Sequence, residues 1–141
     1  MLERLKSHFG FDRFLPLQEE IIDRVLARKD TLALMPTGGG KSLCYQLPAL
    51  SFAGVTVVVS PLIALMKDQV DSLSAHGIDA AFINSTLPSG EISRVLARAR
   101  DGSLKILYLA PERMALAGFR DFLRSLEVSL FAIDEAHCIS E

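Results

Sequence analysis

The sequence predicts an α/β fold, a doubly wound and mainly parallel sheet with helices on both faces. Short apolar runs rich in β-branched residues recur along the 141-residue chain, and stretches with apolar residues at helical spacing separate them. The runs are apolar at consecutive positions, which is typical of strands covered by helices on both sides. Strands that alternate with helices favour a sheet whose ligands bind beyond the carboxyl ends of the strands.

Five apolar runs are predicted strands, although pattern alone does not distinguish them from buried helical segments. They span residues 31–35, 55–60, 80–84, 104–109 and 130–134. The order along the chain is βαβαβαβαβ.

Apolar stripes at helical spacing predict the helices. The first follows Pro16, which suits an initial helical turn, and the third stops at Asp101-Gly102. The stripes are Leu17, Ile21, Ile22, Val25 and Leu26; Leu62, Leu65, Met66, Val70 and Leu73; Ile92, Val95, Leu96 and Ala99; and Phe119, Phe122, Leu123 and Leu126. A further helical stretch, 42–47, follows the first strand.

Composition excludes several classes of protein. The formal charge is −2, so any contact with nucleic acid has to be local. Cys44 and Cys138 are far apart and show no metal-ligand or disulfide spacing, which favours a reducing, cytoplasmic setting. No apolar run is long enough to cross a bilayer, and the N-terminus lacks a signal-peptide pattern, so we expect no membrane partner.

The loop after the first predicted strand predicts a phosphate site. Its glycines let backbone N–H groups point inward, Lys41 supplies a charge for phosphates, and the Ser42 hydroxyl is a ligand for Mg²⁺. Met35 stands where the strict pattern has glycine, but strand, loop and helix together favour a phosphate loop over a plain glycine turn. The expected nucleotide contacts are Pro36, Thr37, Gly38, Gly39, Gly40, Lys41 and Ser42.

Two adjacent carboxylates follow the last predicted strand. Asp134 is the expected partner of Mg²⁺, largely through water, and Glu135 is the expected base for the attacking water. A helix N-cap would explain either residue alone. Beside a phosphate loop, the pair favours nucleotide hydrolysis, with Lys41, Asp134 and Glu135 as the catalytic residues.

Four segments resemble the RecQ family of superfamily-two DNA helicases, in the family's order and separations. They are Gly38–Pro48, Ser60–Gln69, Ala110–Arg113 and Asp134–Ser140. Residues 9–22 also fit the motif that precedes the family's phosphate loop. The resemblance implies an ATP-dependent helicase that moves 3′ to 5′ on DNA, with ATP and Mg²⁺ as cofactors and DNA repair and recombination as its setting.

The resemblance also implies how the adenine base is bound. Gln18 matches the family's adenine reader, and Phe11 falls where the family places an aromatic ring against the base. Leu15 departs from the usual arginine, and an aliphatic side chain cannot supply the cation–π term. We therefore expect weaker or less selective adenine binding.

The DNA-binding residues implied by the resemblance are Ser60, Pro61, Lys67 and Arg113. A strand end followed by a helix start offers N–H groups and Ser60 to a phosphate, and Lys67 and Arg113 add charge. Without the resemblance, a solvated surface or ion pairs with Asp68 or Glu112 would be the simpler interpretation of the two cations. Asn84-Ser85 ends a strand at the same edge, and His137 matches the residue that couples the nucleotide and DNA sites.

The resemblance places residues 1–141 in a partial first RecA-like lobe, with an adenine-recognition segment at 1–28 and a core at 29–141. The second lobe, the zinc region and the winged helix are expected to be absent, and the 141 residues alone inactive or weakly active. Single-stranded and duplex DNA are the expected partners, with single-stranded-DNA-binding protein as a further one. The alternatives are a nucleotide- or DNA-binding fragment without motor activity and an RNA helicase of the DEAD/DEAH groups.

Overall fold

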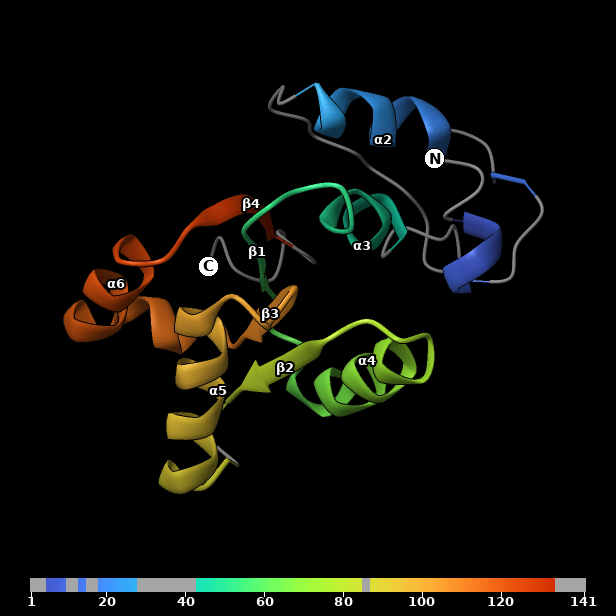
Figure 1. Cartoon of the computed structure of the whole chain (residues 1–141). Coiled ribbons are helices and arrows are strands. Elements are labelled where there is room, and N and C mark those ends of the chain that lie inside the picture. The colour runs from blue at the N-terminus through green and yellow to red at the C-terminus, as the bar shows by residue number, and fades with distance from the viewer. Residues whose placement is uncertain (1–4, 10–12, 15–17, 28–42, 85–86, 134–141) are drawn as a thin grey trace. The chain divides into compact units, whose positions relative to one another are not determined.

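The computed structural model describes residues 5–9, 13–14, 18–27, 43–84 and 87–133. The chain divides into two compact units, residues 1–52 and 53–141. The predicted strand at 31–35 lies outside the described residues. Four strands and their helices are described in the second unit, and this unit carries the sheet (Figure 1).

All four described strands are parallel, as predicted. They are β1 (Val55–Val59), β2 (Ala80–Ile83), β3 (Ile106–Leu109) and β4 (Val128–Ile133), and they pair in the order β2-β3-β1-β4. All five residues of β1 are buried. Burial on both faces explains why this strand is apolar at every position except Thr56 and does not alternate.

Two helices cover one face of the sheet (Figure 1). They are α5 (Ser89–Asp101) and α6 (Ala117–Arg124), and their predicted stripes pack into a core with the inward side chains of β1, β2 and β3. Gly102 ends α5 in the left-handed region at φ +84°, which confirms the predicted stop. The Arg100 guanidinium lies 4.9 Å from the centre of the Phe122 ring and braces α5 against α6.

A third helix, α4 (Ile63–Ala75), covers the opposite face. Met66 and Leu73 of its predicted stripe are buried, but Leu62 and Leu65 are exposed. These two leucines of the stripe stay uncovered because α4 begins at the carboxyl edge of the sheet, where the strands no longer cover it. On the same face, the buried Thr56 hydroxyl has no hydrogen-bond partner among the described residues.

The strand boundaries differ from prediction at the two later strands. β3 begins at Ile106 instead of Leu104, and β4 begins two residues early, at Val128. The register between β1 and β4 shifts after the Val55–Val128 pair, so that Thr56 pairs with Leu130. Ser129 is the extra residue, a bulge that the apolar pattern does not reveal.

The first unit contains three described helices. A π-helical turn, η1 (Leu5–Phe9), was not predicted, whereas α2 (Gln18–Leu26) and α3 (Leu43–Ala49) match the predicted helical segments. Leu5, Ile22, Leu43 and Leu47 form their shared core. Burial raises the pKa of the Cys44 thiol, which keeps it protonated at neutral pH.

Within the described ranges, no helix combines the length and apolar character that a membrane span requires.

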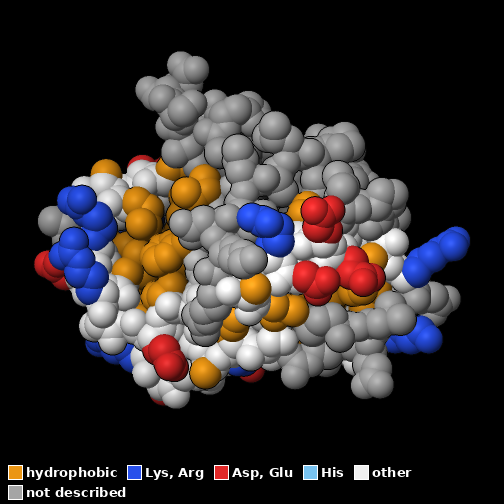
Figure 2. Space-filling model, turned by 90° about the horizontal axis from the view of Figure 1, so that it is seen from above, with side chains coloured by type: hydrophobic (Ala, Val, Ile, Leu, Met, Phe, Trp, Pro, Cys, Tyr) orange, Lys and Arg blue, Asp and Glu red, His pale blue; other side chains and the backbone are white. Residues whose placement is uncertain are grey.

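Strand β4 exposes apolar side chains at the end of the described sheet. Phe131 is 51% exposed and Ile133 is 61% exposed. None of the described strands pairs with the outer edge of β4. Figure 2 shows hydrophobic side chains gathered on one face, with Lys and Arg side chains at their margin. An uncovered strand edge with apolar side chains favours association between chains.

We expect the 141-residue chain to self-associate through β4. Replacing Phe131 and Ile133 together by serine should lower the mass measured by sedimentation at equal concentration, because both side chains are exposed and neither fills a core. Leu116→Ser is the matched control, since Leu116 is also 51% exposed but lies outside the strand. An equal effect of the control would exclude β4 as the contact.

Candidate nucleic-acid interface

Two segments leave the carboxyl edge of the sheet side by side, Ser60–Gln69 after β1 and Ala110–Arg113 after β3. Strands β1 and β3 end in register, with Val59 opposite Leu109. The Ser60 N–H donates to the Leu109 carbonyl at 3.0 Å, and the Ala110 N–H donates to the Ile83 carbonyl at 3.2 Å. We call these two segments the strand-end site. Their juxtaposition agrees with the expectation that ligands bind at this edge.

The start of α4 offers fewer free N–H groups than predicted. The Leu62 N–H donates to the Ser60 hydroxyl oxygen at 3.2 Å, and the N–H groups of Ile63 and Leu65 donate to carbonyls within the same turn. Ser60 is 5% exposed, and its hydroxyl uses an acceptor position in this turn, which leaves its proton for another group. Ser60 therefore offers a donor from its side chain, while three of the nearby backbone N–H groups are already used.

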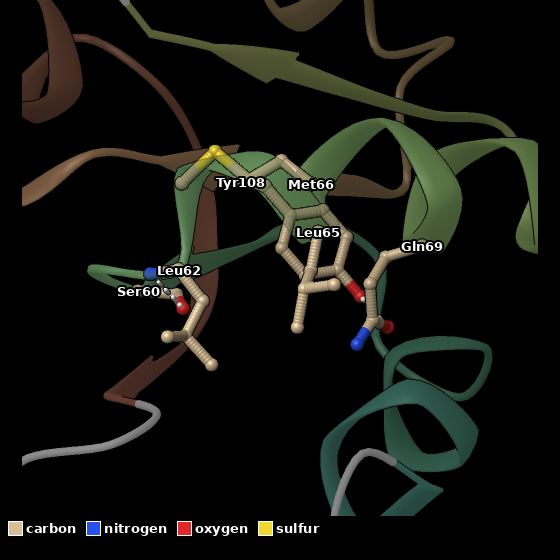
Figure 3. Close-up of a pocket in the computed structure, with 6 residues that line it drawn as sticks. All are labelled: Ser60, Leu62, Leu65, Met66, Gln69 and Tyr108. Atoms are coloured by element: carbon tan, nitrogen blue, oxygen red, sulfur yellow. Dashed lines mark hydrogen bonds between the residues drawn. The ribbon is translucent and has the colours of Figure 1, made fainter.

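A small pocket lies between β1, β3 and α4 (Figure 3). Its lining residues are Ser60, Leu62, Leu65, Met66, Gln69 and Tyr108. The cavity volume is about 20 Å³, which holds a water molecule but not a nucleotide base. The pocket is therefore too small to take up a base.

Polar side chains from β3 and the end of β2 reach α4 beneath this surface. The Tyr108 hydroxyl donates to Gln69 Oε1 at 3.2 Å, and Figure 3 shows the phenol pointing toward that amide. Asn84 is 2% exposed, and its Nδ2 donates weakly to the Met66 sulfur at 3.9 Å. Asn84 is thus packed under α4, and Ser85, which follows it at the same edge of the predicted sheet, lies outside the described residues.

The two predicted cations of the strand-end site differ in their surroundings. The Lys67 side chain is 72% exposed and pairs with Asp71 at 2.7 Å, not with Asp68. The hydrogen bond to Asp71 is the main cause that raises the pKa of Lys67, so the ammonium stays charged at neutral pH. Arg113 is half-buried in the 3₁₀ helix η2 (Pro111–Ala115) and forms no ion pair with another described residue. Both cations remain available to an anion, because an exposed pair such as Lys67–Asp71 is weak.

The sequence interpretation missed two features of this site. Leu62 is 38% exposed and Leu65 is 48% exposed, so the first turn of α4 presents apolar side chains beside Ser60. The bond from Tyr108 to Gln69 was also not predicted. A tyrosine in an otherwise aliphatic strand is a usable signal for such a bond, because a buried phenol hydroxyl requires a partner.

The predicted nucleotide site lies mostly outside the described residues. This holds for Phe11, Leu15, the phosphate loop at 36–42, Asp134 with Glu135, and His137. Gln18 is described: it is 2% exposed, at the first position of α2. No cluster of metal-ligating side chains occurs within the described ranges, which include neither Ser42 nor Asp134. The roles of these residues stay predictions.

The parallel sheet and its covering helices form an α/β fold like that of RecA-like helicase domains. A hypothetical ATP-dependent RNA helicase from Sulfolobus tokodaii superposes with a TM-score of 0.77 and 25% identity, over 99% of this chain and 42% of that one. The DUF1998 helicase MrfA, in a structure bound to DNA, superposes with a TM-score of 0.74 over 94% of this chain and 20% of the other. At 22% identity, the likeness to MrfA concerns the fold alone.

Comparison of the sequence with known proteins identifies the helicase family. The DEAD/DEAH box helicase model matches residues 15–141, and the chain belongs to this family. It is 51% identical to the ATP-dependent DNA helicase RecQ of Bacillus subtilis and 50% identical to that of Pasteurella multocida, over 100% and 99% of this chain. The RecQ resemblance is confirmed. The chain spans 25% and 22% of the length of these two relatives.

Proposed function

We propose that this chain is part of the first motor lobe of an ATP-dependent DNA helicase that moves 3′ to 5′. The observation that carries the proposal is the identity of about half, over essentially the whole chain, to proteins named ATP-dependent DNA helicase RecQ. The phosphate-loop and Asp-Glu motifs support the ATPase part of the activity. The same proposal divides the chain into an adenine-recognition segment at 1–28 and a core at 29–141.

ATP and Mg²⁺ are the proposed cofactors. Bound Mg²⁺ supplies charge that stabilises the transferring phosphoryl group. Lys41 would contact the phosphates, Ser42 and Asp134 would hold the metal, and Glu135 would accept the proton of the attacking water. Gln18 and Phe11 would select adenine, and His137 would couple the two sites. Leu15 in place of arginine supports weaker adenine binding.

Single-stranded DNA is the proposed ligand of the strand-end site. Ser60 offers a hydroxyl donor, and Lys67 and Arg113 offer charge to phosphates. Pro61 would fix the chain direction at the strand end, and the exposed Leu62 and Leu65 would contact sugars or bases by apolar packing. Duplex DNA and a single-stranded-DNA-binding protein are further proposed partners of the whole enzyme, and the cytoplasm, beside the nucleoid in a bacterium, is the location that a DNA substrate favours.

The RNA-helicase alternative draws support from the structural likeness to the Sulfolobus protein, whose name includes RNA helicase. Stimulation of ATP hydrolysis by single-stranded DNA and RNA of equal length, measured in the full-length enzyme, tests the two. We expect DNA to stimulate and RNA to compete poorly. Stronger stimulation by RNA would overturn the DNA assignment.

The fragment alternative is tested on the 141 residues alone. We expect DNA-stimulated hydrolysis that is absent or weak, because a helicase lobe requires charge from its partner lobe at the transition state. Stimulation comparable with that of the full-length enzyme would show that this chain contains the complete motor.

Replacing Arg113 tests the proposed DNA face directly. Arg113→Ala should weaken binding of a labelled oligothymidylate and make the salt dependence of log K shallower by about 0.7, the value for one lost phosphate contact on a single strand. Fluorescence anisotropy at several salt concentrations measures both. Arg94→Ala is the matched control, because Arg94 is an exposed arginine of α5 that pairs with Glu91. Equal slopes for wild type and Arg113→Ala would remove Arg113 from the site.

A further inference from the structure

The helix that carries Lys67 holds more negative than positive charge. The ionisable side chains of α4 are Lys67, Asp68 and Asp71, so one lysine stands against two aspartates and the formal charge of the helix is −1. All three residues are exposed. Carboxylates at this position repel phosphates, and the charge of α4 therefore works against the proposed ligand of the strand-end site.

One of the two carboxylates pairs directly with the Lys67 ammonium. Lys67 Nζ donates to Asp71 Oδ2 at 2.7 Å, the short end of the range for a charge-assisted hydrogen bond. Asp68 forms no ion pair with another described residue, because adjacent residues of a helix do not face each other. Asp71 is thus the carboxylate that a phosphate would meet at Lys67.

Stabilisation of the helix is a weak explanation for this pair. In the ion pairs of α5 and α6, the acidic residue precedes the basic one, which is the order that the helix dipole favours. In α4 the order is reversed, since Lys67 precedes Asp71. The two side chains are also 72% and 60% exposed, and an exposed pair adds little to stability. The effect of Asp71 on Lys67 is the stronger explanation.

We propose that Asp71 is a positioning residue that limits the affinity of the strand-end site, because its carboxylate competes with nucleic-acid phosphates for the Lys67 ammonium. The proposal rests on the proposed function of that site. A phosphate that reaches Lys67 either displaces the carboxylate, and the ion pair is lost, or joins it, and two anions then share one cation. Both routes oppose binding. A helicase that moves along a strand has to release each phosphate, and a weakened contact at Lys67 favours that release.

The test measures binding of a labelled oligothymidylate by the full-length enzyme at low ionic strength, where exposed charges are screened least. Asp71→Asn keeps the shape of the side chain and removes its charge. We expect the affinity to rise by up to about fivefold, the upper range for an exposed ion pair. Asp71→Glu keeps the charge four residues from Lys67 and should bind as the wild type does.

The matched control is Asp68→Asn, which removes the same charge next to Lys67 without breaking an ion pair. Its gain in affinity should be clearly smaller. In a Lys67→Gln background, Asp71→Asn should raise the affinity no more than this control does, because the residue through which Asp71 acts is then neutral. Thermal melting of all variants separates a change in binding from a change in folding.

Several outcomes would overturn the inference. One is wild-type or lower affinity in Asp71→Asn, and another is an equal gain in Asp68→Asn or Asp71→Glu. A full gain from Asp71→Asn in the Lys67→Gln background would mean that Asp71 acts only through overall charge.

The Lys67→Gln variant alone separates the inference from the proposed function. If it binds as tightly as the wild type, Lys67 is not part of the DNA site, and the inference fails with that contact. If Lys67→Gln binds more weakly and Asp71→Asn shows no gain, the inference alone is rejected.

Discussion

Glu135→Gln in the full-length enzyme should lower the rate of ATP hydrolysis by about 10²- to 10⁴-fold, the contribution of a positioned general base. The amide has nearly the shape of the carboxylate but cannot accept the proton of the attacking water. ATP binding should persist, because Lys41 and the phosphate loop are unchanged. Steady-state hydrolysis and binding of a labelled ATP analogue measure the two effects separately.

A matched substitution distinguishes this role from a general effect of charge. Glu91→Gln makes the same chemical change on α5, where Glu91 pairs with Arg94 at the surface, and hydrolysis should stay at the wild-type rate. Lys41→Ala should instead abolish turnover, because it removes the positive charge that would contact the phosphates. Equal rates for wild type and Glu135→Gln would remove Glu135 from the role of base.

Gly54→Ala should destabilise the second unit by about 3 kcal/mol or more, at the upper end of the cost of inserting a methyl group into a packed site. A Cβ at Gly54 would lie 2.1 Å from the Glu127 carbonyl oxygen and 2.7 Å from the Ser129 hydroxyl oxygen. The first of these atoms belongs to the backbone, so the start of β4 would have to move. That movement breaks the bond from the Gly54 N–H to Ser129 Oγ, now 2.8 Å long.

Urea unfolding of both variants and wild type measures this loss. Gly90→Ala is the control, because a Cβ there meets nothing within 4 Å and alanine favours a helix over glycine by up to about 1 kcal/mol. We expect opposite signs for the two glycines. A Gly54→Ala protein as stable as the wild type would mean that β1 and β4 separate at this end without cost.

The fold was predictable from sequence where both faces of an element are covered. Residues 55–59 are apolar except for Thr56 and are buried throughout, and the stripe of α5 faces the core as its spacing indicates. The early start of β4 was not predictable, because Ser129, the bulged residue, accepts a hydrogen bond from the Gly54 N–H, 75 positions away in the chain. The sequence around Ser129 does not show that a residue so distant in the chain will bond to it.

The candidate site was predictable in part, for a similar reason. The resemblance to the RecQ family pointed to Ser60 and Arg113, and parallel strands bring the segments after β1 and β3 to one edge. The exposure of Leu62 and Leu65 was not predictable, because helical spacing does not show where the sheet ends. The Tyr108 bond joins residues 39 positions apart, and Lys67 selects Asp71 over Asp68 because four residues bring side chains together on a helix.

The in-register ending of β1 and β3 has a mechanical consequence for the proposed helicase. Neighbouring strands are held about 4.8 Å apart by their hydrogen-bond ladder. If the two segments of the strand-end site bind nucleic acid as proposed, their starting points keep a constant separation. A step along the nucleic acid would then come from movement of this sheet as one body against another part of the enzyme.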